Sequence, residues 1–339
     1  MSDKWYRKSC DPSGTMISTR VRLARNLSAY PFPFRMTTEQ RQEVATLVTE
    51  AAERLGGLSL RCLDLSACAA RDRLAMTERH VISHEFASKG EGVLLLSEDE
   101  SISIMINEED HVRIQVMCPG MDFETAYTLA DQIDTALDEQ LHFAFDERLG
   151  YLTQCPTNLG TGMRASVMLH LPALQENGLI SSLSNRVAKL GMVVRGAYGE
   201  GTEPIGALYQ LSNQTTMGIS EGTAIENLRD IAKEIAEKEV ALRKKCLRDD
   251  VYEDAIWRSL GVLKTARLLT TGEAMECLSR LMIGAAEGLF SNASTETLTA
   301  LMKDVQPGCL MSDAGEDMSL QVRDRRRAAL VRTACGEWK

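Results

Sequence analysis

The chain lacks the features that mark membrane, secreted and nucleic-acid-binding proteins. No hydrophobic run in its 339 residues approaches the ~20 residues of a membrane-spanning helix, and no apolar segment follows the charged N-terminus as in a signal peptide. Its nine cysteines occur singly, without a Cys-x-x-Cys pair, which favours a reduced cytoplasm over a disulfide framework. A net charge of −10 argues against a nucleic-acid binder, whose surface would be basic. We therefore expect a cytoplasmic globular protein with no membrane contact and no direct nucleic-acid partner.

Alternating apolar residues predict antiparallel strands between about residues 92 and 117. The runs 102–106 and 112–116 both place an apolar residue at every second position. This alternation puts His111, Arg113 and Gln115 on one face, opposite the face that packs on the core.

The next part of the chain mixes helices and strands. Residues 122–145 follow a helical pattern with Asp122 as the N-cap, and a strand at 167–171 stops at Pro172. The other expected elements are a helix at 182–190 that ends at Gly191 and two strands at 192–195 and 207–211.

The composition changes at Glu221. A long charged helix is expected from there to about residue 249, and the remainder is almost wholly helical, with breaks near Gly272 and Pro307. We place a domain boundary near Asp250, which gives units of residues 1–250 and 251–339.

The segment from Cys155 to Ser166 combines a lone cysteine, the glycine pair Gly160 and Gly162, and Arg164. Glycines let backbone N–H groups approach an anion closely, and an arginine just beyond them can clamp a phosphate through two hydrogen bonds. Cys155 has no partner at metal-ligand or redox spacing, so we interpret it as a single thiol at a site. The segment indicates a phosphate site beside a thiol.

Five arginines fall at expected strand ends or loops: Arg20, Arg22, Arg113, Arg164 and Arg195. An Arg-x-Arg pair on a strand presents both guanidinium groups on the same face. Guanidinium stays charged and forks onto phosphate oxygens, so a convergent set would suit a triphosphate. For any one arginine taken alone, a surface salt bridge is the alternative interpretation.

Carboxylates from two separate loops could hold a cationic substrate or act as a base. Glu108, Glu109 and Asp110 lie at the turn between two expected strands, and Glu200 lies in a later glycine-flanked loop. By composition alone, a solvated hairpin turn is the favoured interpretation of the first cluster.

Two basic motifs remain. His80 and His84 lack the His-Glu-x-x-His order and a third ligand, so no metal site is predicted, and His80 is assigned either to a nucleotide contact or to a partly buried surface position. Arg323 and Arg327 lie one helical turn apart and could hold one phosphate, although charge alone favours a basic last turn that complements the helix dipole.

These motifs, in this order, resemble the phosphagen (guanidino) kinase family, and most of all its bacterial protein-arginine kinases. The motifs are Ser18-Thr19-Arg20-Val21-Arg22, the run from Asn107 to Arg113, the block from Cys155 to Pro172, and Arg195-Gly196-Ala197-Tyr198-Gly199-Glu200. Because the first motif begins at Ser18, we expect no N-terminal domain of the kind that closes over small guanidino substrates. The Arg-Asp-x-x-Arg-Ala motif at 323–328 favours the same branch. The resemblance implies an α/β (α+β) fold, a mainly antiparallel sheet flanked by helices, with a smaller all-helical C-terminal domain for dimerisation and phosphoarginine binding.

The resemblance also implies roles for residues of this chain. Glu109 would orient the substrate guanidinium and take its proton, Glu200 would be a second carboxylate clamp, and Cys155 would lie against the guanidinium as a thiolate. The ATP site would comprise Ser18, Thr19, Arg20, Val21, Arg22, His80, Arg113, Arg164, Ala165, Ser166, Val167, Met168, Arg195, Gly196, Ala197, Tyr198, Gly199 and Glu200. Arg323, Asp324, Arg327 and Ala328 would bind phosphoarginine as an allosteric ligand, with Arg325 and Arg326 as two additional charges inside the motif. ATP and Mg²⁺ are the implied cofactors, and the metal would be held mainly by phosphates and water.

The function implied is transfer of the γ-phosphoryl group of Mg-ATP to arginine side chains of proteins, which marks them for regulated proteolysis or stress control. Implied partners are proteins with exposed arginine, a second copy of the chain, a zinc-containing activator protein and a AAA+ protease. One alternative is a kinase for free arginine or another small guanidino metabolite. The other is a catalytically silent phosphoarginine-binding adaptor, against which the presence of Glu109, Cys155 and Glu200 argues.

Overall fold

The computed structural model describes residues 4–8, 11–196 and 204–338, and one large antiparallel sheet organises it. In the described chain eight strands follow the spatial order β2-β3-β4-β5-β1-β8-β10-β9, and all neighbouring pairs are antiparallel. The strands are β1 (Met16–Arg25), β2 (Leu60–Asp64), β3 (Val93–Ser97), β4 (Ile102–Ile106), β5 (Val112–Pro119), β8 (Met163–His170), β9 (Met192–Gly196) and β10 (Leu208–Asn213). A separate small sheet pairs β6 (Phe145–Asp146) with β7 (Gly150–Tyr151).

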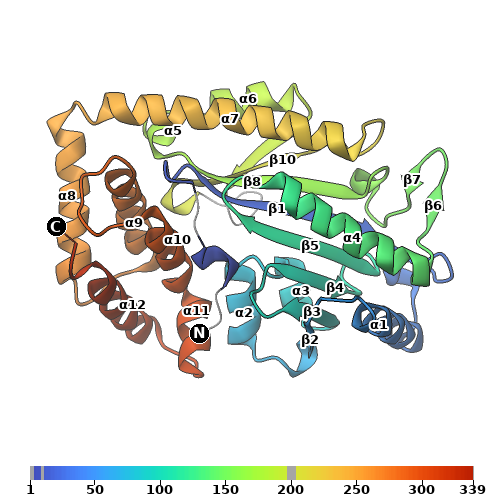
Figure 1. Ribbon diagram of the computed structural model, residues 1–339. Coiled ribbons are helices and arrows are strands. Elements are labelled where there is room, and N and C mark those ends of the chain that lie inside the picture. Colours follow the sequence, from blue (N-terminus) through green and yellow to red (C-terminus); the bar gives the residue numbers. More distant parts are fainter. Residues whose placement is uncertain (1–3, 9–10, 197–203, 339) are drawn as a thin grey trace.

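Helices cover both faces of the sheet and build the C-terminal part. Figure 1 shows α4 and α7 running across one face, α2 and α3 on the other side, and α8 to α12 gathered at one end. The α-helices are α1 (Thr38–Glu53), α2 (Ala70–Glu78), α3 (His84–Lys89), α4 (Phe123–Leu141), α5 (Pro172–Glu176), α6 (Ile180–Ala188), α7 (Glu221–Cys246), α8 (Asp250–Thr265), α9 (Thr271–Ala286), α10 (Thr295–Asp304), α11 (Pro307–Ala314) and α12 (Leu320–Cys335). Short 3₁₀ turns are η1 (Trp5–Arg7), η2 (Pro33–Arg35), η3 (Leu65–Ala67), η4 (Pro156–Asn158) and η5 (Ile205–Ala207). The expected mixed α and β architecture, with a helical C-terminal part, is confirmed.

The two faces of the sheet differ in chemistry because side chains alternate along each strand. The face beneath α4 and α7 is apolar, and Val21, Ile114, Val167 and Leu211 on four adjacent strands are all fully buried there. Removal of this surface from water is the main stabilising contribution to the fold. Polar and charged side chains of the same strands therefore project to the opposite face.

The opposite face is also covered, by a second apolar cluster that includes Phe86 of α3 and Met105 of β4. His111 and Gln115 lie on this side, as the alternation predicts, yet 0% and 2% of their surfaces are exposed. The Gln115 amide donates to the backbone carbonyls of His80 and Val81. The predicted face is thus an interior layer.

Several boundaries differ from the sequence prediction, among them the helix expected at 182–190, which is Ile180–Ala188. The helix expected at 122–145 is capped by Asp122, as predicted, but it ends at Leu141, where His142 takes the left-handed conformation and the Asp138 carboxylate accepts from Phe143 N–H at 2.6 Å. The strand expected at 167–171 runs from Met163 to His170. Local side-chain hydrogen bonds and strand pairing decide these ends, and apolar periodicity does not report them.

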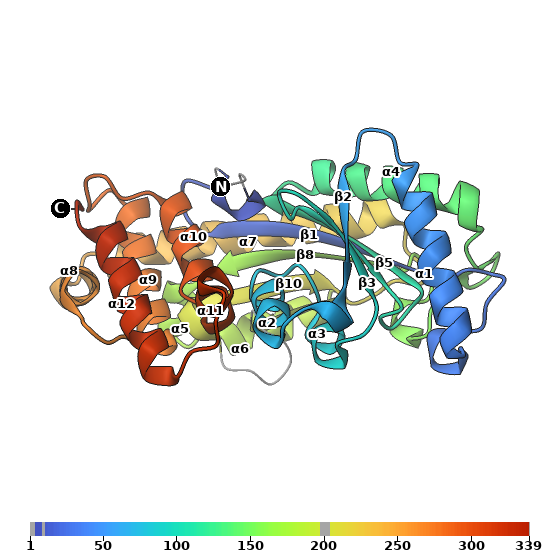
Figure 2. The same ribbon diagram turned by 90° about the horizontal axis from the view of Figure 1, so that it is seen from below.

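The C-terminal helices have a core of their own, to which the sheet contributes Ile17, Met168 and Leu208. Helix α7 ends at Cys246 and α8 begins at Asp250, next to the predicted domain boundary. Figure 2 shows α11 lying beside α2, on the sheet face opposite α4 and α7. Among the helices of the described residues, none combines the length and hydrophobicity needed to cross a membrane.

Candidate active site

The five predicted arginines lie on four strands of the large sheet, β5, β1, β8 and β9, on the face opposite α4 and α7; β10 separates β9 from the other three. Arg22 of β1 is the direct cross-strand partner of Arg164 of β8, and Arg20 pairs in the same way with Ser166. Arg113 of β5 pairs with Ala24, two positions along from Arg22 and therefore on the same face, and Arg195 of β9 faces Gln210 of β10. Cross-strand partners share a face, so strand pairing brings these guanidinium groups to one side of the sheet.

The electrostatics of the cluster show that its arginines lie close together. Burial lowers the pKa of Arg20 to about 10, and the charges of Arg113 and Arg164 add to the effect. Burial also lowers the pKa of Arg22 strongly, and the charges of its three arginine neighbours lower it further. The pKa of Arg164 is lowered first by burial and then by the charge of Arg195. Within the described part of the chain, the buried Nε atoms of Arg22 and Arg164 have no hydrogen-bond acceptor. The negatively charged oxygens of a bound anion would supply the hydrogen-bond acceptors that these Nε atoms lack.

A small pocket opens beside Arg20. Its walls are Ser18, Arg20, His80, Met117, Ser166, Met168 and Gln210. The Arg20 guanidinium donates to Gln210 Oε1 at 2.6 Å, which aims it along the pocket wall. His80 is buried and has a φ of 62°, in the left-handed region that histidine seldom adopts. Burial, then the charges of Lys303 and Arg20, hold the pKa of His80 far below its ordinary value, so the ring is neutral. Its volume is about 10 Å³, enough for about one water molecule, so the pocket marks the surroundings of Arg20 and His80 and does not enclose a nucleotide.

The acidic turn is not the solvated hairpin that composition favours. Arg113 donates to Glu108 Oε1 at 2.7 Å and to Glu109 Oε2 at 3.0 Å. Asp110 is fully buried and accepts from the Asn26 amide and the Gln154 N–H, both at 2.7 Å. Burial raises the pKa of Glu109, while Arg113 opposes the rise. The solvated interpretation is therefore wrong for Glu108 and Asp110, and Glu109 is held half-exposed at the edge of the arginine cluster.

Cys155 and the glycine pair lie next to Arg164. Cys155 precedes η4, its Sγ is 3.1 Å from Thr157 Oγ1, and Cys155 lies close enough to Arg164 to be among the groups that influence the pKa of that arginine. Gly160 and Gly162 have positive φ values, and a Cβ on Gly160 would lie 2.2 Å from the Thr216 carbonyl oxygen. These glycines are required by the close approach of two backbone segments. Cys155 and Glu109 thus flank Arg164.

Strand alternation divides the predicted nucleotide residues. Ser18, Arg20, Arg22, Arg164, Ser166 and Met168 lie on the arginine face. Thr19, Val21, Ala165 and Val167 are buried on the core side of the same strands, so their predicted role in the nucleotide site does not extend to their side chains. Gly196 ends β9 next to Arg195. Ala197, Tyr198, Gly199 and Glu200 lie outside the described residues.

The predicted phosphoarginine motif begins α12, far along the chain from this cluster. Arg327 is 1% exposed and donates to the carbonyl oxygens of Val305 and Leu269 and to Asp324 Oδ1. Ala328 is fully buried. Arg323, in contrast, is half-buried, and its Nε has no acceptor within the described residues. Arg326 pairs with Asp313, which neutralises one of the two additional charges. The motif is thus divided between a buried anchor, Arg327, and an available arginine, Arg323.

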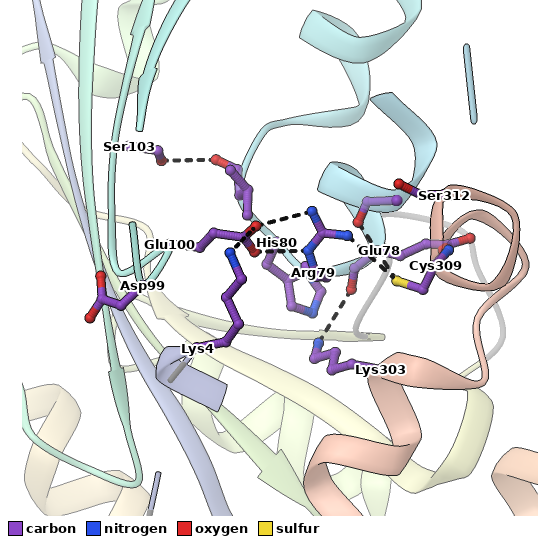
Figure 3. Close-up of polar contacts among 12 residues, drawn as sticks. Lys4, Glu78, Arg79, His80, Asp99, Glu100, Ser103, Lys303, Cys309 and Ser312 are labelled. Atoms are coloured by element: carbon purple, nitrogen blue, oxygen red, sulfur yellow. Dashed lines mark hydrogen bonds and ion pairs between the residues drawn. The ribbon is translucent and has the colours of Figure 1, made fainter. Parts of the chain in front are cut away.

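Sequence reasoning missed a polar cluster where the C-terminal helices meet α2 (Figure 3). The Glu78 carboxylate accepts from the N–H groups of Gly308 and Cys309, at 3.0 and 2.8 Å, at the start of α11. A Cβ on Gly308 would lie 2.6 Å from Leu74 Cγ, so glycine is needed for the helices to approach. Lys303 of α10 points at the Glu78 carbonyl oxygen, beside His80. The one signal in the sequence is Pro307-Gly308, which predicts a helix break but not the contact with α2.

Gln210 was missed for a different reason. It lies in β10 between Tyr209 and Leu211, and its side-chain oxygen accepts a hydrogen bond from Arg20. Its importance follows from this contact with another strand, which the local pattern of β10 does not show.

Comparisons with known proteins agree with this geometry. Residues 43–242 match the ATP:guanido phosphotransferase C-terminal catalytic domain, and residues 249–339 match the protein-arginine kinase McsB C-terminal domain. A protein-arginine kinase of Brevibacillus brevis is 42% identical over 334 residues, which cover 97% of this chain and 94% of that one. The solved structure of a lombricine kinase aligns with a TM-score of 0.61 and 25% identity, over 72% of this chain and 74% of that one. The duplicated taurocyamine kinase of Schistosoma mansoni, with bound transition-state analogue components, aligns with a TM-score of 0.60 and 28% identity over 70% of this chain, although only 35% of that longer protein is covered.

The catalytic unit and the C-terminal unit are therefore both accounted for by one group of relatives. The similarity to the protein-arginine kinase runs through nearly the whole length of both chains, and the fold is shared with solved guanidino kinases. The chain belongs to the ATP:guanido phosphotransferase (phosphagen kinase) family and, within it, to the protein-arginine kinases.

Proposed function

We propose that this chain is an ATP-dependent enzyme that phosphorylates arginine side chains of proteins, with the arginine face of its sheet as the triphosphate site. The observation that carries the proposal is the convergence of cationic groups, whose charges lower the pKa values of Arg20, Arg22 and Arg164. The positive charges of such a cluster repel one another until a bound anion compensates them. Phosphoryl transfer also requires positive charge around the moving group, which these arginines supply in a fixed geometry.

The acceptor arginine is assigned to the side of the cluster where Glu109 and Cys155 flank Arg164. A guanidinium nitrogen attacks the γ-phosphorus, a P–N bond forms, and the P–O bond to ADP breaks. The guanidinium pKa exceeds ~12, so the nitrogen must lose a proton as it attacks. Burial raises the pKa of Glu109, which makes this carboxylate a better proton acceptor. Cys155 as a thiolate and Glu200 as a second carboxylate complete the proposed clamp on the acceptor.

Magnesium would enter this site on the phosphates of ATP. Among the residues that the structure describes, no cluster of three or more His, Cys, Asp or Glu side chains could hold a metal ion. The nearest carboxylates, Glu108 and Glu109, are engaged by Arg113. We therefore assign no protein ligand to Mg²⁺, which would add positive charge at the phosphates.

A second site is proposed at the start of α12 for phosphoarginine as an allosteric ligand. The observation in its favour is Arg323, whose Nε lacks an acceptor within the described residues, beside Asp324. An arginine fork would bind the phosphoryl group, and the carboxylate would accept from the ligand's guanidinium N–H groups. Arg327 would hold Asp324 in position from beneath, through its hydrogen bond of 2.6 Å.

The cellular role follows the family. We propose a cytoplasmic homodimer whose products are marked for regulated proteolysis in stress, with a zinc-containing activator protein and a AAA+ protease as partners. A kinase for free arginine and a silent adaptor are not favoured. Nearly full-length similarity to a protein-arginine kinase weighs against the first, and the catalytic side chains gathered around Arg164 weigh against the second.

The direct test is transfer of labelled phosphate from ATP, run in parallel on an arginine-rich unfolded protein and on free arginine. We expect acid-labile label on the protein only, because a P–N bond forms. Label on free arginine would move the enzyme to the metabolic branch. Absence of label on both, with nucleotide binding intact, would favour the adaptor.

A further inference from the structure

Lys303 is a cation that the proposed catalytic mechanism does not use. It lies near the end of α10, in the C-terminal helices, and 6% of its surface is exposed. Its ammonium donates one long hydrogen bond, 3.5 Å, to the backbone carbonyl oxygen of Glu78. No carboxylate of the described residues lies within ion-pair distance of it, because the Glu78 carboxylate is turned to α11. A buried ammonium with so little compensation is costly unless another group completes its environment.

The surroundings of Lys303 indicate where that group would come from. Its charge lowers the pKa of His80, and the charge of Arg20 in turn lowers the pKa of Lys303. His80 and Arg20 are both walls of the pocket beside the arginine cluster. Figure 3 shows Lys303 and the His80 ring side by side, with Lys303 reaching across from the C-terminal helices. Lys303 is not itself a wall of this pocket, but it approaches two of its walls, His80 and Arg20, from the C-terminal helices.

We propose that Lys303 is a nucleotide-binding residue, which donates from α10 to an anionic oxygen of the phosphate chain of ATP or ADP. This inference rests on the proposed ATP site. Lys303 joins the cluster at Arg20, so the phosphate chain would extend from Lys303 and Arg20 toward Arg22 and Arg164. The C-terminal helices then contribute directly to the catalytic site.

The contact between α11 and α2 fixes the position of this lysine. Glu78 holds the first N–H groups of α11, and Gly308 lets α11 approach Leu74. Lys303 lies at the end of the preceding helix, four residues before Pro307. The packing of α11 on α2 therefore sets the position of Lys303 relative to His80.

Proton uptake on nucleotide binding is a measurable consequence of the proposed role of Lys303. Burial lowers the pKa of Lys303 to about 7, with Arg20 lowering it further and Cys309 and Glu78 opposing the shift. The titratable ring next to it is His80, and on the other side of α10, Arg7 of η1 is paired with Asp304. A bound phosphate favours the ammonium form, so above about pH 7 the protein takes up a proton as the nucleotide binds.

The test is calorimetry of ADP binding to the full chain at pH 8, in Tris and in HEPES. Lys303→Met keeps the length of the side chain and removes its charge. We expect at least about tenfold weaker ADP binding, because a hydrogen bond to a charged group is lost. The dependence of the binding enthalpy on the buffer should shrink in the same variant. Lys303→Gln should show the same two losses and serves if the methionine variant does not fold.

Lys264→Met is the matched control. Lys264 is also in the C-terminal helices and donates to a backbone carbonyl, that of Trp338, at 2.9 Å. The Lys264→Met variant should bind ADP with the affinity of the wild type. Equal affinity and equal buffer dependence in the wild type and both Lys303 variants would overturn the role of Lys303 alone. A wild-type protein that binds neither ADP nor ATP would instead overturn the proposed function.

Discussion

Arg22 of β1 and Arg164 of β8 are direct cross-strand partners, and each keeps a buried Nε without an acceptor in the described structure. Like charges directly opposite each other destabilise a sheet. Two more arginines, Arg20 and Arg113, add to the repulsion at Arg22. The sheet thus carries a local instability that a polyanion would relieve, and this is the main physical argument for a triphosphate site.

Arg164→Met is expected to stabilise the nucleotide-free protein by about 1 kcal/mol, because the cross-strand repulsion disappears. The same change should remove most of the stabilisation that Mg-ATP gives the wild type, since binding to the folded state alone raises its stability. Urea unfolding with and without Mg-ATP measures both effects. Arg186→Met, in an exposed ion pair with Glu234, is the control and should change neither. A nucleotide-free variant less stable than the wild type would contradict the argument.

Glu109→Gln is expected to abolish phosphoryl transfer while leaving ATP binding intact, because the amide keeps the shape of the side chain but accepts no proton. Transfer assays and nucleotide calorimetry separate the two effects. In the wild type, transfer should fall with decreasing pH at values above the ordinary range for glutamate, since burial raises the pKa of Glu109. Glu147→Gln, on an exposed turn, serves as the control. Loss of nucleotide affinity in the Glu109 variant would reject its assigned role.

Three buried histidines predict lower stability in acid. Burial lowers the pKa of His111 to about 4 and holds those of His80 and His170 well below the ordinary value. The unfolded chain therefore binds more protons than the folded one below about pH 6.5, so stability falls as the pH decreases. Between pH 7.5 and 5.5 we expect each histidine to remove about 1 kcal/mol of unfolding free energy.

Denaturant unfolding at the two pH values measures this slope. The His170→Asn variant should show a pH dependence of the unfolding free energy that is smaller by the contribution of one histidine. His170 accepts a hydrogen bond from Arg243 and lies 2.7 Å from Ser279 Oγ in a fully buried site. A slope that is the same in the variant and the wild type would exclude His170 as a contributor.

The two arginines of the α12 motif should behave differently on substitution. Arg327→Ala leaves the Val305 and Leu269 carbonyl oxygens without their donor and is expected to destabilise the protein by about 1–3 kcal/mol. Arg323→Ala should keep the melting temperature of the wild type but lose binding of free phosphoarginine, measured by calorimetry. Unchanged phosphoarginine binding in the Arg323 variant would remove this residue from the proposed receptor. A double substitution would confuse the two effects, because only one of the arginines is available to a ligand.

Much of the fold and part of the site follow from local pattern. Alternation along the strands predicts that Arg20 and Arg22 share a face, and helix-capping rules predict the start of α4 at Asp122. The order of the motifs indicates the family before any contact is known. What alternation leaves open is the partner strand, and the pairing of Arg22 with Arg164 across 142 positions is decided by the register of β1 and β8.

The sequence by itself determined the class of chemistry, because guanidinium, carboxylate and thiol groups in these motifs have few other joint uses. Tertiary structure alone decided which of them are available. It buried Arg327 beneath Asp324, made Glu108 an interior partner of Arg113, and brought Lys303 beside His80. Burial and charge compensation depend on residues far apart in the chain, and the period of a helix or strand carries no information about them.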